Sequence, residues 1–137
     1  MLKDIPKLKV TDLGVAIVPK KTQSADNEVD LWDVYLVNLK KDAIFSIFIN
    51  SRGYGIRNNE EIKTTNFRFS IEELTPESYV KIESISTEVF DLTNEYWISF
   101  KEGTVMYDKK FIFVKGSIDF SNFTAIPMLN ELGVFIK

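Results

Sequence analysis

Apolar residues recur at nearly every second position along most of this 137-residue chain. They are mainly β-branched and aromatic residues, which pack well on a pleated sheet, rather than strong helix formers. The clearest example is the stretch FRFSIE at residues 67–72, in which apolar and polar side chains alternate strictly. A period of two places alternate side chains on opposite faces of a strand. The chain is therefore predicted to be all-β.

Polar turns divide these stretches into about seven strands, with no amphipathic helix between them. The expected strands cover residues 9–18, 31–39, 43–50, 67–72, 78–85, 94–101 and 105–114. Many short strands joined by short turns are typical of two packed antiparallel sheets, so we expect an immunoglobulin-like β-sandwich. A chain of this length holds one such domain, covering residues 1–137.

The turns suggest how neighbouring strands pair. A tight polar turn is predicted to join the strands at residues 31–39 and 43–50 as a hairpin. Two glycines within 51–55 are expected to end the second of these strands, because glycine permits positive φ, and 57–60 should continue as a turn. In this interpretation Tyr54 lies at a loop tip between glycines.

Three segments are expected to lie outside the strands. Residues 1–8 form an N-terminal arm, residues 20–30 form a mobile polar loop, and residues 117–137 pack on the sandwich or on a partner. Within the last segment, a proline and a glycine bracket a short helical turn over 126–133.

The three residues near the end of the chain, Val134, Phe135 and Ile136, are too apolar to remain in water. They either add a short strand to a sheet edge or dock on a neighbouring subunit. We therefore count them among the candidate contact residues.

The residues that most enzymes use are missing. The chain has no histidine and no cysteine, which excludes imidazole triads, thiol nucleophiles and the usual zinc sites. It also has no phosphate-binding loop, dinucleotide motif or nucleophile elbow. Two carboxylate pairs, at 60–61 and 72–73, consist of adjacent strand residues that point to opposite faces. The sequence predicts no enzyme, no catalytic residue, no cofactor and no metal site.

One acidic stretch could hold calcium through oxygen ligands, from Asp26, Glu28, Asp30 and Asp33. The spacing differs from that of an EF-hand loop and the central glycine is missing. A solvated acidic loop is the favoured interpretation, and calcium binding by residues 26–33 stays open.

The charge balance bears on partners and location. A net charge of −3 and a pI near 5.1 argue against DNA binding and disfavour RNA, and three separated dibasic steps are interpreted as solvated turns. No apolar run is long enough to span a membrane, and residues 1–8 lack the apolar core of a signal peptide. A cytoplasmic protein is expected.

Two aromatic residues are predicted to be exposed and to contact a ligand or partner. Trp97 is out of phase with its apolar neighbours, and Tyr54 lies between glycines. We expect a noncatalytic protein-interaction or scaffold module that binds an unknown protein partner or its own copies. The alternative is a small-molecule or carbohydrate binder that uses Trp97 or Tyr54 as a stacking platform.

Several short motifs carry a resemblance to a known group. They include SRGY at 51–54, ESYVKIE at 77–83, YDKKF at 107–111 and AIPM at 125–128. The chain resembles, over almost its whole length, small bacterial proteins of about this size that are named as phenylalanyl-tRNA synthetase subunits. The resemblance implies a further alternative, an RNA- or translation-associated accessory protein.

Overall fold

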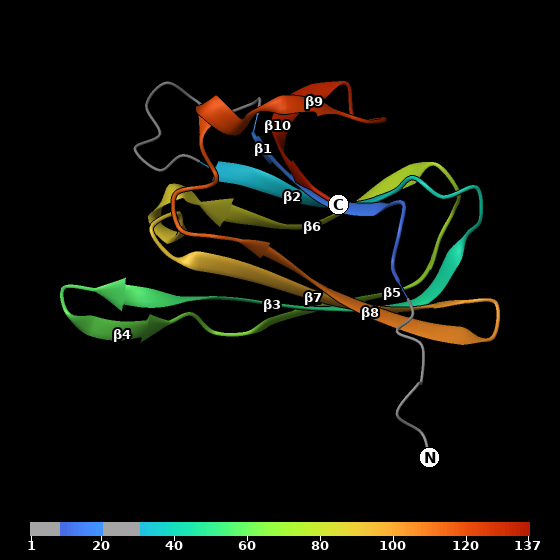
Figure 1. Ribbon diagram of the computed structural model, residues 1–137, viewed down its shortest axis with the longest axis horizontal. Coiled ribbons are helices and arrows are strands. Elements are labelled where there is room, and N and C mark those ends of the chain that lie inside the picture. The colour runs from blue at the N-terminus through green and yellow to red at the C-terminus, as the bar shows by residue number, and fades with distance from the viewer. Residues whose placement is uncertain (1–8, 21–30) are drawn as a thin grey trace, which may run out of the picture.

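The structure is a computed structural model and describes residues 9–20 and 31–137. The described residues form two layers of strands (Figure 1). The strands are β1 (Leu13–Pro19), β2 (Leu31–Asn38), β3 (Ile44–Arg57), β4 (Glu60–Lys63), β5 (Phe67–Leu74), β6 (Ser78–Ser86), β7 (Thr93–Glu102), β8 (Val105–Phe113), β9 (Thr124–Ile126) and β10 (Glu131–Ile136). Two 3₁₀ turns, η1 (Thr87–Val89) and η2 (Phe120–Asn122), complete the described elements. Neither is long enough to cross a membrane.

Both layers are antiparallel sheets. The first has the order β6-β2-β1-β10-β9, and the second has the order β4-β3-β7-β8, with β5 pairing along β3. This arrangement confirms an all-β chain with two sheets. The described residues hold ten strands rather than seven, because β4, β9 and β10 come from segments expected to be turns or tail. These strands have only three to six residues, too few for a clear alternating pattern.

The core lies between the sheets. Its largest fully buried side chains come from the second sheet and include Tyr96, Phe100, Phe111 and Phe113. Burial of each such side chain contributes about 1.5–3 kcal/mol to folding. The alternation seen in the sequence thus places one face of β7 and β8 in this core.

The predicted hairpin of residues 31–39 and 43–50 is wrong, because β2 and β3 belong to different sheets. The chain therefore crosses from one sheet to the other between β2 and β3. This connection is held in place by Asn38, which is fully buried. Its Nδ2 donates to the carbonyl oxygens of Asp42, Leu74 and Thr75 at 3.1, 3.3 and 3.0 Å, and its Oδ1 accepts from the amide of Lys40 at 3.0 Å. A few extended residues span the roughly 10 Å between packed sheets, so a short connection fits a crossing as well as a turn.

β3 also continues through the two glycines that were expected to end it. A Cβ atom on Gly53 would lie 3.1 Å from a methyl carbon of Thr64, and one on Gly55 would lie 3.1 Å from a methyl carbon of Leu92. The glycines therefore permit close packing rather than a turn. The chain reverses at Asn58 and Asn59, whose φ angles of 54° and 65° suit a two-residue hairpin turn.

The helical turn predicted over residues 126–133 is likewise wrong. β9 and β10 form a hairpin in which Ile126 pairs with Glu131. The turn between them holds Met128 and Asn130 at φ of 71° and 56°, a left-handed conformation that a right-handed helix cannot include. Proline and glycine are signals for hairpins as well as for helix ends.

Two further expectations fall outside the described residues. These are the N-terminal arm at 1–8 and almost all of the predicted loop at 20–30, of which only Lys20 is described. Its amide donates to the carbonyl oxygen of Leu31 at 3.0 Å.

Candidate binding face

The structure separates the predicted contact residues into two groups. Trp97 lies on the outer face of the second sheet and is 43% exposed. Tyr54 lies within β3 rather than at a loop tip and is half-buried, with the guanidinium carbon of Arg52 5.2 Å from its ring centre. Both residues lie on the same face, because Asn50 pairs with Trp97 and Tyr54 follows four residues after Asn50 on the same strand.

The C-terminal residues belong to the first sheet instead. Val134 is 6% exposed, and Phe135 and Ile136 are half-buried. The three residues pair with Ile17, Ala16 and Val15 of β1, while β9 flanks the first half of β10. The tail therefore forms a strand within its own sheet, between two other strands rather than at an edge.

A groove of about 410 Å³ lies on the outer face of the second sheet. It is lined by residues of β3, β5 and β7, namely Phe48, Ile49, Asn50, Arg68, Phe69, Ser70, Trp97 and Ser99. Its volume falls within the range of small-ligand pockets. We refer to this feature as the groove.

The strand register explains why these side chains converge. Asn50 pairs with Arg68 on one side and with Trp97 on the other, and Trp97 pairs in turn with Lys110 of β8. Directly paired residues have Cβ atoms about 4.5–5.5 Å apart, so the four side chains form a continuous line across four strands. We call this line the groove row: Arg68, Asn50, Trp97 and Lys110.

An acceptor in the groove lacks a donor. Oδ1 of Asn50 is buried and accepts no hydrogen bond from any described residue. Buried polar atoms are nearly always paired, because an unpaired one has lost its water without compensation. Sequence reasoning did not single out Asn50, because an asparagine in an apolar stretch carries no signal of what lies opposite it.

The cations at the two ends of the groove row also lack carboxylate partners among the described residues. Arg68 is exposed and forms no ion pair there, whereas Arg52, on the next row, pairs with Glu95 at 3.1 Å. Nζ of Lys110 lies 4.8 Å from the centre of the Trp97 ring. The groove row itself therefore carries two cations and no carboxylate, while an exposed carboxylate, Asp108, pairs with Ser99 on the row beside it.

Large apolar side chains surround the groove row. Phe48 is 60% exposed on the row beside it, where it pairs with Ser70 and Ser99. Further exposed residues of the same sheet are Phe45, Met106 and Ile112. Apolar side chains gathered on one surface are a feature of interaction sites.

A second polar group lies between the sheets and was missed by sequence reasoning. Oε2 of Glu83 accepts hydrogen bonds from Oγ of Ser51 and Oη of Tyr96, both at 2.9 Å, although strict alternation along the strand would point this side chain outward. A bulge in the pairing of β6 with β2, opposite Val34 and Tyr35, shifts the alternation there.

Burial raises the pKa of Glu83, and the two hydrogen bonds only partly offset this effect. The same burial, together with the nearby carboxyl, raises the pKa of Tyr96 well above its usual value. A perturbed carboxyl can mark a catalytic site. Here both hydroxyl groups donate to the carboxyl itself, which fits a role in joining the sheets.

The acidic stretch proposed for calcium is described only at its last member. Oδ1 of Asp33 lies 3.2 Å from Nζ of Lys81, 3.5 Å from Nζ of Lys20 and 2.7 Å from Oγ of Ser84. Burial alone would raise the pKa of Asp33, but the hydrogen bonds from Ser84 and Lys81 outweigh it and lower the pKa. This carboxylate is neutralised by lysines, and the described residues contain no group of three potential metal ligands.

No family model matches the sequence, and no curated protein is significantly similar to it. Among solved structures, the sporulation control protein Spo0M from Bacillus subtilis is similar at 13% sequence identity with a TM-score of 0.33. The match covers 75% of this chain and 49% of Spo0M, so the chain spans about half the length of that protein.

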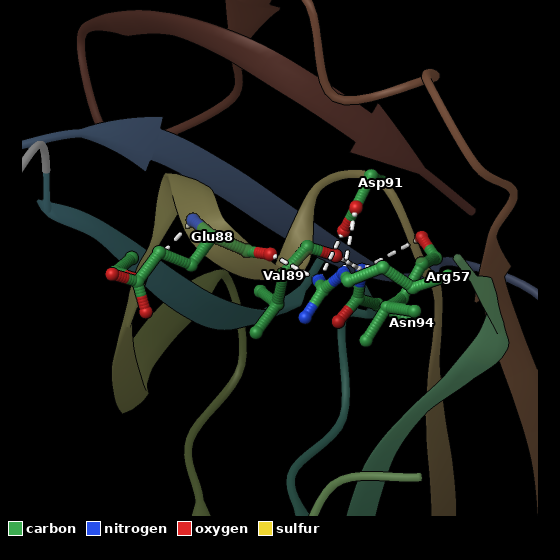
Figure 2. A network of polar contacts seen from close by, with 7 residues as sticks. Arg57, Glu88, Val89, Asp91 and Asn94 are labelled. Carbon is green, nitrogen blue, oxygen red and sulfur yellow. Dashed lines mark hydrogen bonds and ion pairs between the residues drawn. The ribbon is translucent and has the colours of Figure 1, made fainter. Parts of the chain in front are cut away.

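An ion pair anchors the hairpin next to Tyr54. Arg57, at the end of β3, donates to both carboxylate oxygens of Asp91 and to the carbonyl oxygen of Glu88 at 2.9 Å (Figure 2). The hydrogen bonds raise the pKa of Arg57 and lower that of Asp91. The contact ties the β3–β4 hairpin to the connection between β6 and β7, which positions this end of the sheet.

Proposed function

We propose that the protein is a noncatalytic protein-interaction module that contacts its partner through the outer face of the second sheet. The observation that carries this proposal is the exposure of Phe48 and Trp97, at 60% and 43%, which line the groove together with Asn50. Aromatic residues and arginine are enriched at the centres of protein interfaces. Such a face provides two aromatic anchors and one arginine that line the same groove.

The noncatalytic part of the proposal rests on composition. The chain has no histidine and no cysteine, so imidazole bases and thiol nucleophiles are missing. The absence of cysteine also supports a cytoplasmic location as part of the proposal, because disulfides are common in small secreted domains.

We also propose that the sandwich is immunoglobulin-like. The order β6-β2-β1 in one sheet and β5-β3-β7-β8 in the other supports this. Immunoglobulin domains pair their strands in the orders E-B-A and, in variable-type domains, C′-C-F-G. On this view β4, β9 and β10 are additions to the common core.

A carbohydrate or other small molecule is the second candidate partner, and the volume of the groove favours it. About 410 Å³ is enough for a ligand of modest size, and Trp97 lies at its wall. A titration of the chain with a panel of mono- and oligosaccharides, followed by the indole NH signal of Trp97, tests this alternative. An unchanged signal across the panel contradicts it.

The test of the interaction module is a pull-down of the tagged full chain from its host's lysate after nuclease treatment, read by mass spectrometry. The double variant Phe48→Ser/Trp97→Ser removes the two anchors. Leu132→Ser is the matched control, because this residue is 61% exposed but lies on β10 in the first sheet.

We expect a reproducible protein partner with the wild type and the control, and its loss with the double variant. Thermal unfolding of all three proteins establishes that the variants are folded. A partner that the double variant retains, or one that nuclease removes, contradicts the proposal.

A further inference from the structure

We infer that the groove binds an extended peptide segment in which an aspartate or glutamate lies two residues from a large apolar side chain. This inference rests on the proposed function, because it states the chemistry of the partner segment that the outer face recognises. It follows from three complementary features of the groove row and its surroundings: an unpaired cation, an unpaired acceptor and two exposed aromatic rings.

The unpaired cation selects for a carboxylate. Arg68 lines the groove and has no ion pair among the described residues. A guanidinium binds a carboxylate through two parallel hydrogen bonds, a geometry that an ammonium group cannot reproduce. Lys110 lies on the same row at β8, three strand spacings from β5, or about 14 Å away. The row is therefore suited to a segment with more than one acidic residue.

The unpaired acceptor selects for a nitrogen–hydrogen donor. Oδ1 of Asn50 lies next to Arg68 on the row and accepts nothing within the part of the chain that the structure describes. A peptide presents a backbone N–H at almost every residue. A segment whose carboxylate reaches Arg68 therefore has amide donors near Asn50 whatever its sequence.

The two aromatic rings select for an apolar side chain beside that carboxylate. Phe48 and Trp97 both line the groove, and its volume of about 410 Å³ accommodates a few side chains rather than a folded domain. In an extended peptide, residues two apart point to the same side and lie about 6.6–6.8 Å apart. That spacing matches the separation along the strands between the groove row, which holds Arg68, and the next row, which holds Phe48 two residues before Asn50.

A sugar fits the same features less well. Nζ of Lys110 lies 4.8 Å from the centre of the Trp97 ring and occupies a ring face on which a sugar would stack. Exposed apolar side chains of the same sheet also lie outside the groove, at Phe45 and Ile112. A peptide held within a larger protein partner covers this surface as well.

The experiment selects random octapeptides, displayed on phage, on the immobilised full chain. Clones that also bind Phe48→Ser/Trp97→Ser are removed, and the remaining peptides are synthesised with a fluorescent label for polarisation measurements. Their affinities are then compared for the wild type, Arg68→Gln and Asn50→Ala. Lys63→Gln is the matched control, because it removes one exposed positive charge from β4, outside the groove.

We expect the enriched peptides to contain an aspartate or glutamate two residues from an aromatic or large aliphatic residue. Arg68→Gln should weaken their binding roughly tenfold, and Asn50→Ala should weaken it several-fold, whereas Lys63→Gln leaves it within about twofold. Enriched peptides without a carboxylate, equal binding to Arg68→Gln, or no groove-dependent peptide at all would overturn the inference.

The outcomes separate this inference from the proposed function. If no acidic peptide is selected but the pull-down partner still depends on Phe48 and Trp97, the peptide chemistry is wrong and the interaction module stands. If the groove instead binds an oligosaccharide of alternating uronic acid and hexosamine, detected by the Trp97 indole signal, the carbohydrate alternative replaces both.

Discussion

Tyr96 of β7 donates a hydrogen bond to Glu83 of β6 across the interior of the sandwich, with 2.9 Å between Oη and Oε2. Ser51 of β3 donates to the same oxygen at the same distance. The contact joins the edge strand of the first sheet to two central strands of the second. A carboxyl in this position makes the packing of the two sheets sensitive to pH.

Glu83→Gln should make the free energy of unfolding less sensitive to pH. Burial raises the pKa of Glu83 in the folded state above its ordinary value of 4.5, so the folded protein holds this proton more tightly than the unfolded chain does. The associated stability is present below pH 4.5 and is lost as the pH rises through the raised pKa. Glutamine stays neutral and still accepts from both hydroxyl groups. The variant should therefore gain stability relative to the wild type as the pH rises.

Urea unfolding of both proteins at several pH values between 4 and 8 measures this difference. Glu73→Gln, at an exposed carboxyl on β5, controls for the loss of one negative charge. A difference that stays constant with pH, or that shrinks as the pH rises, would show that Glu83 is not buried in this way.

Asn38→Ala should destabilise the fold by about 3 kcal/mol, because it leaves several buried backbone groups without partners. The side chain of Asn38 bonds to three carbonyl oxygens and one amide where the chain crosses between the sheets. Chemical denaturation provides the measurement. Asn122→Ala is the control: this exposed residue makes one hydrogen bond to Ser117, and we expect a loss below about 1 kcal/mol. Equal effects at the two positions would contradict the role given to Asn38.

Gly133→Ala should cost about 2 kcal/mol or more. A Cβ atom at this position would lie 2.4 Å from a methyl carbon of Val18 and 2.6 Å from the carbonyl oxygen of Ile17. β10 would then have to move away from β1. Thermal or urea unfolding tests the change, with Leu132→Ala next to it expected to stay within about 0.5 kcal/mol because Leu132 is 61% exposed. If Gly133→Ala leaves the stability unchanged, the C-terminal strand does not pack on β1 as described.

Arg57→Met should loosen the β3–β4 hairpin without unfolding the sandwich. The substitution removes the bonds to Asp91 and Glu88 that tie the hairpin to the β6–β7 connection. Hydrogen exchange should become faster at the amides of 54–63 and stay unchanged at the buried residue Ile98. Lys41→Met, which breaks the exposed ion pair with Glu77, is the control and should leave the hairpin amides as they are. Unchanged exchange in Arg57→Met would show that the ion pair does not restrain the hairpin.

Local sequence patterns were enough to locate most of the strands. The alternation in β5 and β7 identifies them as strands, and the phase of Trp97 against Tyr96 and Ile98 predicts an exposed indole, which the structure has. Each of these features depends on residues a few positions apart, since side-chain direction in a strand follows from the backbone alone. The apolar character of residues 134–136 likewise predicted that they must be covered.

The tertiary structure decided the features that depend on partners distant in sequence. A short polar connection can join two strands of one sheet as a hairpin or lead from one sheet to the other. Asn38 favours the second arrangement only because its side chain bonds to carbonyl groups near residue 74. The apolar residues near the end of the chain pair with β1, which lies at the opposite end of the described chain. Glu83 turned inward because of a bulge in its pairing with β2.

The groove row is also a product of register. Arg68, Asn50, Trp97 and Lys110 lie on four strands, and no spacing along the chain places them side by side. The sequence by itself determined which residues point to which face of each strand, because that choice is made by the local backbone. Which faces meet, and which acceptor or cation is left without a partner, was decided only when the strands paired, because hydrogen bonding and burial depend on atoms brought together from across the chain.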